Sequence, residues 1–171
     1  MSLVVIGCDP GPEKSALVVF NGESVVNTEE GANANIESWL ENLSAPEDRL
    51  VLVIEKVESF GMAVGAEVFE TVFHSGRFAK AFEPCRVERM PRRVVKQHIC
   101  HTARATDANI RQALIDRFGP GSDRAIGTKK NPGPLYTLKG HLWSALAVAI
   151  TWWDREANGP EEVRPGVRAD F

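Results

Sequence analysis

The sequence predicts an α/β domain in which helices flank a five-stranded mixed sheet with three antiparallel and two parallel strands. Three observations lead to this prediction. Three β-rich segments follow one another at the start of the chain, amphipathic helix patterns separate two further strands, and the last helix is apolar on nearly every side. The length of 171 residues is sufficient for one domain with a sizeable core.

The first three strands are expected at 3–9, 15–20 and 23–28. Asn21-Gly22 between the second and third is the two-residue signal for a tight hairpin turn, so these strands should form an antiparallel meander. A helix follows over 33–43, because its apolar residues recur at positions i, i+3, i+4 and i+7.

The second half of the chain alternates strands with helices. The expected elements are a strand at 50–55, a helix at 61–82, a strand at 85–90, a helix from Pro91 to Cys100, a helix from Asp107 to Gly119, a loop over 119–139 and a helix at 141–154. A right-handed crossover would place the fourth strand beside the first. We take 1–158 as the domain and expect 159–171, which lacks a core pattern, to be a mobile tail.

Composition narrows the class of protein. Hydrophobic residues make up 43% and charged residues 25% of the chain, as in ordinary globular proteins. No apolar run approaches the roughly 20 residues that span a bilayer, and the N-terminus lacks the pattern of a signal peptide. Cys8, Cys85 and Cys100 are widely spaced, which favours reduced thiols over a zinc site. We therefore expect a cytoplasmic protein that does not contact membranes.

The charge is unevenly distributed along the chain. The net charge is −3, yet the stretch from Arg77 to Arg104 holds eight lysines and arginines and only two glutamates. Such a basic stripe is typical of a nucleic-acid contact surface, although a solvated helix face explains it equally well.

Two carboxylates stand at the ends of predicted strands. Asp9 follows the first strand and precedes Pro-Gly, so it is either a turn residue or a metal ligand. Glu55 ends the fourth strand, where the alternative is a surface glutamate paired with Lys56. If the two strands are neighbours, the carboxylates repel each other unless a cation lies between them. Mg²⁺ or Mn²⁺ fits, because both prefer oxygen ligands.

The start of the last helix offers two candidates for a third metal ligand. His141 and Ser144 are spaced i and i+3, so both side chains can face the same point. The alternatives for His141 are a helix cap or a place in a polar notch.

Four stretches occur in this order along the chain: IGCDPG, VIEKV, RRVVKQHI and HLWSALAVAI. On these motifs, which span roughly 1 to 154, the chain resembles the RuvC-like Holliday-junction resolvases of the RNase H-like superfamily. DANIRQALIDRFG and KNPGPLY resemble the versions carried by bacteriophages and prophages. The resemblance implies an RNase H-like fold and a homodimeric crossover junction endodeoxyribonuclease. Such an enzyme hydrolyses phosphodiester bonds in four-way junctions during DNA recombination, repair or phage DNA processing.

The resemblance also implies roles for individual residues. Asp9, Glu55 and His141 would hold Mg²⁺ or Mn²⁺, with two ions in each site supporting cleavage by water that leaves a 5′-phosphate. Lys96 matches a basic residue near the scissile phosphate. Ser144 departs from the family, which has a carboxylate at this position, so the fourth ligand is open.

Two further residues have two interpretations each. Asp107 is suited to cap the helix that it begins, but it could instead face the metals and replace the carboxylate missing at position 144. Phe60 lies where the family uses an aromatic ring to stack on unpaired bases, and core packing is its alternative.

The remaining candidates concern DNA and assembly. Basic residues are expected to contact phosphates of branched DNA: Arg89, Arg92, Arg93, Lys96, Lys129 and Lys130. One side of the long helix at 61–82 carries Phe69, Val72, Phe73 and Gly76, which form either core or a two-fold dimer face.

Three other functions are alternatives to a junction resolvase. One is a broader debranching nuclease that acts on forks and flaps, and another is a branched-DNA-binding protein without catalysis. An actin-like phosphotransferase also begins with a strand, an aspartate and a glycine turn. The chain lacks the further glycine-rich phosphate loops that this last class needs.

Overall fold

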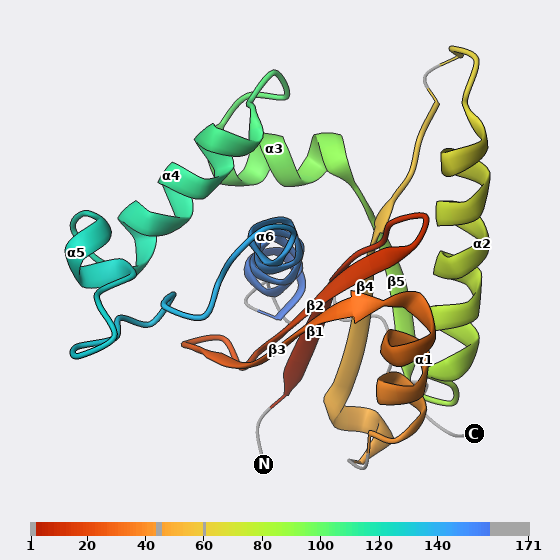
Figure 1. The fold of residues 1–171 in the computed structure, drawn as a ribbon, viewed down its shortest axis with the longest axis horizontal. Coiled ribbons are helices and arrows are strands. Elements are labelled where there is room, and N and C mark those ends of the chain that lie inside the picture. The colour runs from red at the N-terminus through yellow and green to blue at the C-terminus, as the bar shows by residue number, and fades with distance from the viewer. Residues whose placement is uncertain (1–2, 44–45, 60, 158–171) are drawn as a thin grey trace, which may run out of the picture.

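One mixed sheet forms the centre of the molecule (Figure 1). The computed structural model describes residues 3–43, 46–59 and 61–157, so the predicted tail at 159–171 lies outside the described residues. The strand order is β3-β2-β1-β4-β5, with bounds β1 Val4–Asp9, β2 Lys14–Phe20, β3 Val25–Ala32, β4 Leu50–Lys56 and β5 Arg86–Pro91. The pairs β1–β2 and β2–β3 are antiparallel, whereas β1–β4 and β4–β5 are parallel. The predicted sheet, with the fourth strand beside the first, is confirmed.

Helices cover both faces of this sheet. They are α1 Asn33–Glu41, α2 Ala66–Ala81, α3 Arg92–Cys100, α4 Asp107–Phe118, the short α5 Ser122–Ala125 and α6 Leu142–Trp152, with a single 3₁₀ turn at Glu47–Arg49. Figure 1 shows α1 and α2 on one side of the sheet and α3, α4 and α6 on the other. A bidentate ion pair between Arg77 and Glu37, with distances of 2.8 Å, ties α2 to α1.

The alternation of side chains along β1 and β4 divides the core in two. Ile6 and Cys8 of β1 belong to the cluster under α1 and α2, as do Leu52 and Ile54 of β4. The intervening residues face α6, because successive side chains of a strand point to opposite faces. Asp9 continues this second set at the end of β1, so its side chain is directed toward the face that carries α3, α4 and α6.

The β2–β3 hairpin forms as predicted, but its loop differs. The loop spans four residues, 21–24, instead of two. The Asn21 side chain accepts hydrogen bonds from the backbone N–H groups of Glu23 (3.0 Å) and Ser24 (2.8 Å), which closes the longer loop. Gly22 has a φ of 96°, and an added Cβ there would lie 2.1 Å from the Trp153 ring. Gly22 therefore lies against the Trp153 ring, a tertiary contact that the local sequence alone does not predict.

Other boundaries also differ from the predictions. Strand β3 spans Val25–Ala32 rather than 23–28, and α1 ends at Glu41 rather than at residue 43. The long helix begins at Ala66 rather than at residue 61, and the expected loop over 119–139 contains the four-residue α5. The last helix ends at Trp152 and continues as a π-helical turn, Trp153–Ala157.

This π-helical turn anchors α6 to its neighbours. Asp154 accepts hydrogen bonds from both terminal nitrogens of Arg117 on α4 (2.6 and 2.9 Å), and its carboxylate lies 2.8 Å from Nε2 of His98 on α3. Burial opposes ionisation of Asp154, but these partners outweigh it and lower the pKa of the carboxyl. The contacts fix α3 and α4, which both begin at the edge of the sheet where β1 and β4 end.

Helix α6 packs tightly against β1 at Gly7. A Cβ added to Gly7 would lie 2.1 Å from the carbonyl oxygen of Ala145 and 2.9 Å from the Ala149 Cβ. The absence of a side chain at Gly7 and the small side chains of Ala145 and Ala149 let α6 lie directly on the strand. This contact fixes the position of the N-terminus of α6 relative to the end of β1.

Two observations bear on the class of protein. Cys8 is a buried thiol, and Cys85 and Cys100 are partly exposed thiols. Among the helices of the described residues, none combines the length and apolar character needed to cross a membrane.

The contact at Gly7 predicts the effect of a single methyl group. We expect Gly7→Ala to lower the free energy of unfolding by about 3 kcal/mol, because the new Cβ collides with backbone rather than with a flexible side chain. Gly31→Ala in β3 is the matched control, since a Cβ there meets no atom within 4 Å. Urea denaturation of both variants measures the difference. Equal stability of the two would show that α6 does not rest on Gly7.

Candidate active site at the edge of the sheet

The register of two parallel strands brings Asp9 and Glu55 together. Cys8 of β1 pairs with Ile54 of β4, so the next residues, Asp9 and Glu55, follow side by side at the carboxyl ends of the strands. Both side chains are largely buried, each with 13% of its surface exposed. The predicted proximity of the two carboxylates is confirmed.

The turn after Asp9 is held by other residues. Buried Ser15 accepts a hydrogen bond from the Gly11 N–H (3.1 Å) and donates one to the Asn33 side chain (2.7 Å). The Asn33 amide in turn donates to the Gly11 carbonyl oxygen (3.0 Å). Because this network fixes the turn, the Asp9 carboxylate is left to interact with other groups. Sequence reasoning missed both Ser15 and Asn33. The only sign of their role in the sequence is that each is a polar residue next to apolar ones.

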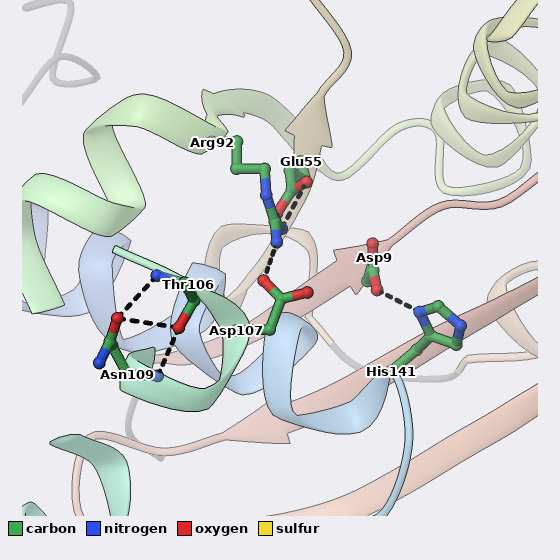
Figure 2. Close-up of polar contacts among 7 residues, drawn as sticks. All are labelled: Asp9, Glu55, Arg92, Thr106, Asp107, Asn109 and His141. Atoms are coloured by element: carbon green, nitrogen blue, oxygen red, sulfur yellow. Dashed lines mark hydrogen bonds and ion pairs between the residues drawn. The ribbon is translucent and has the colours of Figure 1, made fainter. Parts of the chain in front are cut away.

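His141 lies at the N-terminal boundary of α6 and contacts Asp9. Its Nδ1 is 2.9 Å from Asp9 Oδ2, as Figure 2 shows. His141 is the N-cap residue of α6, but its side chain makes no capping hydrogen bond, so the interpretation of this side chain as a helix cap is wrong. The backbone N–H of His141 donates to Glu30 Oε1 of β3 (3.2 Å). Glu30, which sequence analysis did not consider, therefore holds the start of α6 next to the end of β1.

Glu55 contacts an arginine rather than a lysine. Arg92, the first residue of α3, places one terminal nitrogen 3.1 Å from Oε1 and 3.0 Å from Oε2 of Glu55. The other terminal nitrogen of Arg92 bonds Asp107 (Figure 2). Lys56 pairs with Glu58 instead, at 3.0 Å, so the expected Glu55–Lys56 alternative is wrong. The position of Arg92 follows from register, because β5 ends at Pro91 opposite Lys56.

Asp107 does not cap α4. Thr106 is the N-cap residue, and it forms a reciprocal capping box with Asn109. The Thr106 hydroxyl accepts from the Asn109 N–H (3.3 Å), while the Asn109 side chain accepts from the Thr106 N–H (2.9 Å). The prediction that Asp107 caps the helix is therefore wrong. Figure 2 shows its carboxylate directed toward Arg92 and Glu55.

The electrostatic environment disfavours charge on the buried carboxylates. The pKa of Glu55 is raised to about 7: burial is the largest cause, Asp9 and Asp107 also raise it, and Arg92 opposes the rise. Burial also raises the pKa of Asp9, against the opposing effect of the hydrogen bond from His141. A further cation near these carboxylates would favour their ionised forms.

The donor set suits a divalent cation, but the side chains are not arranged as a ready cage. Asp9, Glu55 and Asp107 offer the carboxylate oxygens that Mg²⁺ and Mn²⁺ prefer. Within the part of the chain that the structure describes, no three histidine, cysteine, aspartate or glutamate side chains already converge on one point. Asp9 pairs with His141, and Glu55 and Asp107 pair with Arg92. We attribute the pairing of Asp9 and Glu55 to their burial, since a buried carboxylate is costly unless it is hydrogen-bonded or paired.

The other predicted site residues lie at varying distances from this centre. Ser144 is half-buried on α6, and its side chain makes no hydrogen bond to any described residue. Lys96 lies one turn after Arg92 on the same face of α3. The prediction for Phe60 falls on a residue outside the described ones.

The predicted DNA-contacting residues are spread over three elements. Arg89 on β5 is exposed and borders a groove that Glu55 also borders. Arg93 is exposed on α3, and Lys129 and Lys130 are exposed in the loop between α5 and α6. The structure thus brings Asp9, Glu55, Arg92, Asp107 and His141 together and leaves the lysines of the loop outside this group.

Solved structures share this fold. The chain is similar to Thermus thermophilus RuvC, with a TM-score of 0.64 and 20% identity over 90% of this chain and 96% of that chain. It is equally similar to T. thermophilus RuvC in complex with Holliday junction substrate, with a TM-score of 0.64 and 20% identity over 87% and 92% of the two chains. No family model and no curated protein matches the sequence. At this identity the comparison establishes the RuvC-like, RNase H-like fold predicted from the sequence.

The capping geometry makes a prediction that separates Thr106 from Asp107. We expect Thr106→Ala to lower the free energy of unfolding by about 1 kcal/mol, because the capping box is lost. We expect Asp107→Asn to change it by less than about 0.5 kcal/mol, because its exposed ion pair contributes little. Chemical denaturation in EDTA measures both. A larger loss for Asp107→Asn than for Thr106→Ala would return Asp107 to the role of a cap.

Proposed function

We propose that this protein is a divalent-metal-dependent endonuclease that cuts four-way DNA junctions by phosphodiester hydrolysis. The observation that carries the proposal is the pair of buried carboxylates, Asp9 and Glu55, side by side at the end of β1 and β4 in a RuvC-like fold. The similar T. thermophilus RuvC has been solved in complex with a Holliday junction substrate, which supports branched DNA as the substrate class.

Asp9, Glu55 and Asp107 would hold the cation, Mg²⁺ or Mn²⁺, in one or two positions. Such a cation supplies an activated water and neutralises charge on the scissile phosphate. Asp107 takes the part of the family carboxylate that Ser144 lacks, since it faces Glu55 and is free of the capping role. His141 orients Asp9 through the 2.9 Å contact or binds the cation itself. Lys96 stands one turn along α3, where it can approach the phosphate.

The basic residues supply the binding surface. Arg89, Arg93, Lys129 and Lys130 are exposed and suited to phosphates on different arms of a branched substrate. Binding through such contacts weakens steeply with salt. The same proposal includes selectivity for four-way junctions over forks and flaps. It also includes a phage origin and a cytoplasmic location. A debranching nuclease and a non-catalytic junction-binding protein are the other outcomes that a substrate panel would reveal.

A homodimer would allow paired cuts across a junction. Phe69, Val72 and Phe73 are exposed by 65%, 52% and 57%, so they are not core residues in the described chain. They share one side of α2 at spacings of i, i+3 and i+4, and exposed Gly76 extends the same side. An apolar face of this kind is suited to pair with its own copy about a two-fold axis.

The nuclease proposal predicts separation of binding from cleavage. We expect Asp9→Asn and Glu55→Gln each to lower the rate of four-way junction cleavage in Mg²⁺ by about a thousandfold, because each removes a cation ligand. Junction binding in EDTA should stay within about threefold of wild type, since phosphate contacts determine it. Asp123→Asn, at an exposed carboxylate on α5, is the charge-matched control and should cleave normally. Cleavage by Asp9→Asn at the wild-type rate would refute the assignment.

The assembly proposal predicts the oligomeric state. We expect wild-type protein to sediment as a dimer at micromolar concentration and the double variant Phe69→Ser/Phe73→Ser to sediment as a monomer, because the apolar face is lost. Val26→Ser, at a residue 59% exposed on β3, is the control and should remain dimeric. A monomeric wild-type protein would contradict the dimer.

A further inference from the structure

Arg92 occupies the position between two carboxylates of the proposed metal site. One terminal nitrogen contacts both oxygens of Glu55, at 3.1 and 3.0 Å, and the other contacts Asp107. These two carboxylates come from β4 and α4, which are far apart in the chain. The guanidinium therefore links them as a cation would (Figure 2).

The charges at this edge are not balanced by Arg92 alone. Asp9, Glu55 and Asp107 carry three negative charges when ionised, and among the residues that the structure describes His141 is the hydrogen-bonded partner of the Asp9 carboxylate. Arg92 contributes one positive charge and stays protonated, because the neighbouring carboxylates outweigh burial and raise its pKa. A divalent ion would balance the group better, but it needs the same lone pairs of Glu55 that Arg92 already uses.

We propose that Arg92 is an internal counter-ion that competes with the divalent cation for Glu55 and Asp107 and moves to a DNA phosphate when the cation binds. This inference rests on the proposed function above. Under this inference Arg92 does more than contact a DNA phosphate, because the affinity of the DNA-free protein for the divalent cation also depends on it.

The surroundings of Arg92 permit this movement. Its side chain keeps 34% of its surface exposed, and it begins α3, so the side chain can turn outward without breaking the helix. Lys96 shares its face of α3 and Arg93 follows it in the chain, which makes this segment attractive to a phosphate. DNA that holds Arg92 would free Glu55, so DNA and metal would each strengthen the binding of the other.

The test measures Mn²⁺ binding to the full chain without DNA, by the electron paramagnetic resonance signal of free Mn²⁺. We expect Arg92→Gln to bind Mn²⁺ about tenfold or more tightly than wild type, because the competing charge is gone. Arg93→Gln makes the same charge change one residue away, where no carboxylate of the site is bonded, and should shift the affinity by less than about threefold. Arg92→Lys, which keeps the charge but cannot span both carboxylates, should fall between wild type and Arg92→Gln.

Thermal unfolding provides an independent readout. In EDTA, Arg92→Gln should melt below wild type, because Glu55 and Asp107 lose their shared partner. Mn²⁺ should raise its melting temperature more than that of wild type. If Arg92→Gln does not fold in EDTA, recovery of its folded state on adding Mn²⁺ supports the inference. The inference is overturned if Arg92→Gln does not recover and Arg92→Lys binds Mn²⁺ no more tightly than wild type.

A second arm adds a saturating four-way junction with uncleavable linkages at the branch. The junction should raise the Mn²⁺ affinity of wild type about tenfold and that of Arg92→Gln by less than about threefold. Equal or weaker Mn²⁺ binding by folded Arg92→Gln, relative to wild type, overturns the inference and leaves the nuclease proposal standing. If neither protein binds Mn²⁺ with or without the junction, the metal-dependent function fails as well.

Discussion

The charge at the end of two parallel strands is the constraint on which the site depends. β1 and β4 end in carboxylates that the register places side by side and that the surrounding core largely buries. The pKa of Glu55 is raised to about 7, chiefly by burial and further by Asp9 and Asp107, although Arg92 opposes the rise. Arg92 and His141 respond to this constraint, since Arg92 pairs with Glu55 and His141 contacts Asp9.

Tight packing holds the groups in place. Gly7 lets α6 rest on β1, and Glu30 receives the backbone N–H of His141, so the start of α6 stays next to Asp9. Asp154 ties α3 and α4 to the far end of α6, which fixes the helices that begin with Arg92 and Asp107. The site therefore lies where β1 and β4 end and α3, α4 and α6 begin, an arrangement that favours precise positioning of ligands.

Sequence reasoning predicted the sheet, because apolar runs and the handedness of crossovers leave few alternatives for the strand order. The proximity of Asp9 and Glu55 followed from that order. The role of Asp107 was wrong because Thr106 and Asp107 are both good cap residues, and only the Thr106–Asn109 spacing favoured the former. Arg92 was grouped with phosphate contacts because its partners, Glu55 and Asp107, lie 37 and 15 residues away and meet it only through tertiary structure.

The most direct test is a crystal structure of the protein grown with Mn²⁺, using the anomalous signal of manganese to locate the ion. We expect an anomalous peak within ligand distance of both Asp9 and Glu55, with the Arg92 guanidinium withdrawn from Glu55. A manganese-loaded crystal in which Arg92 still binds both oxygens of Glu55, and no peak lies between the ends of β1 and β4, would contradict the account.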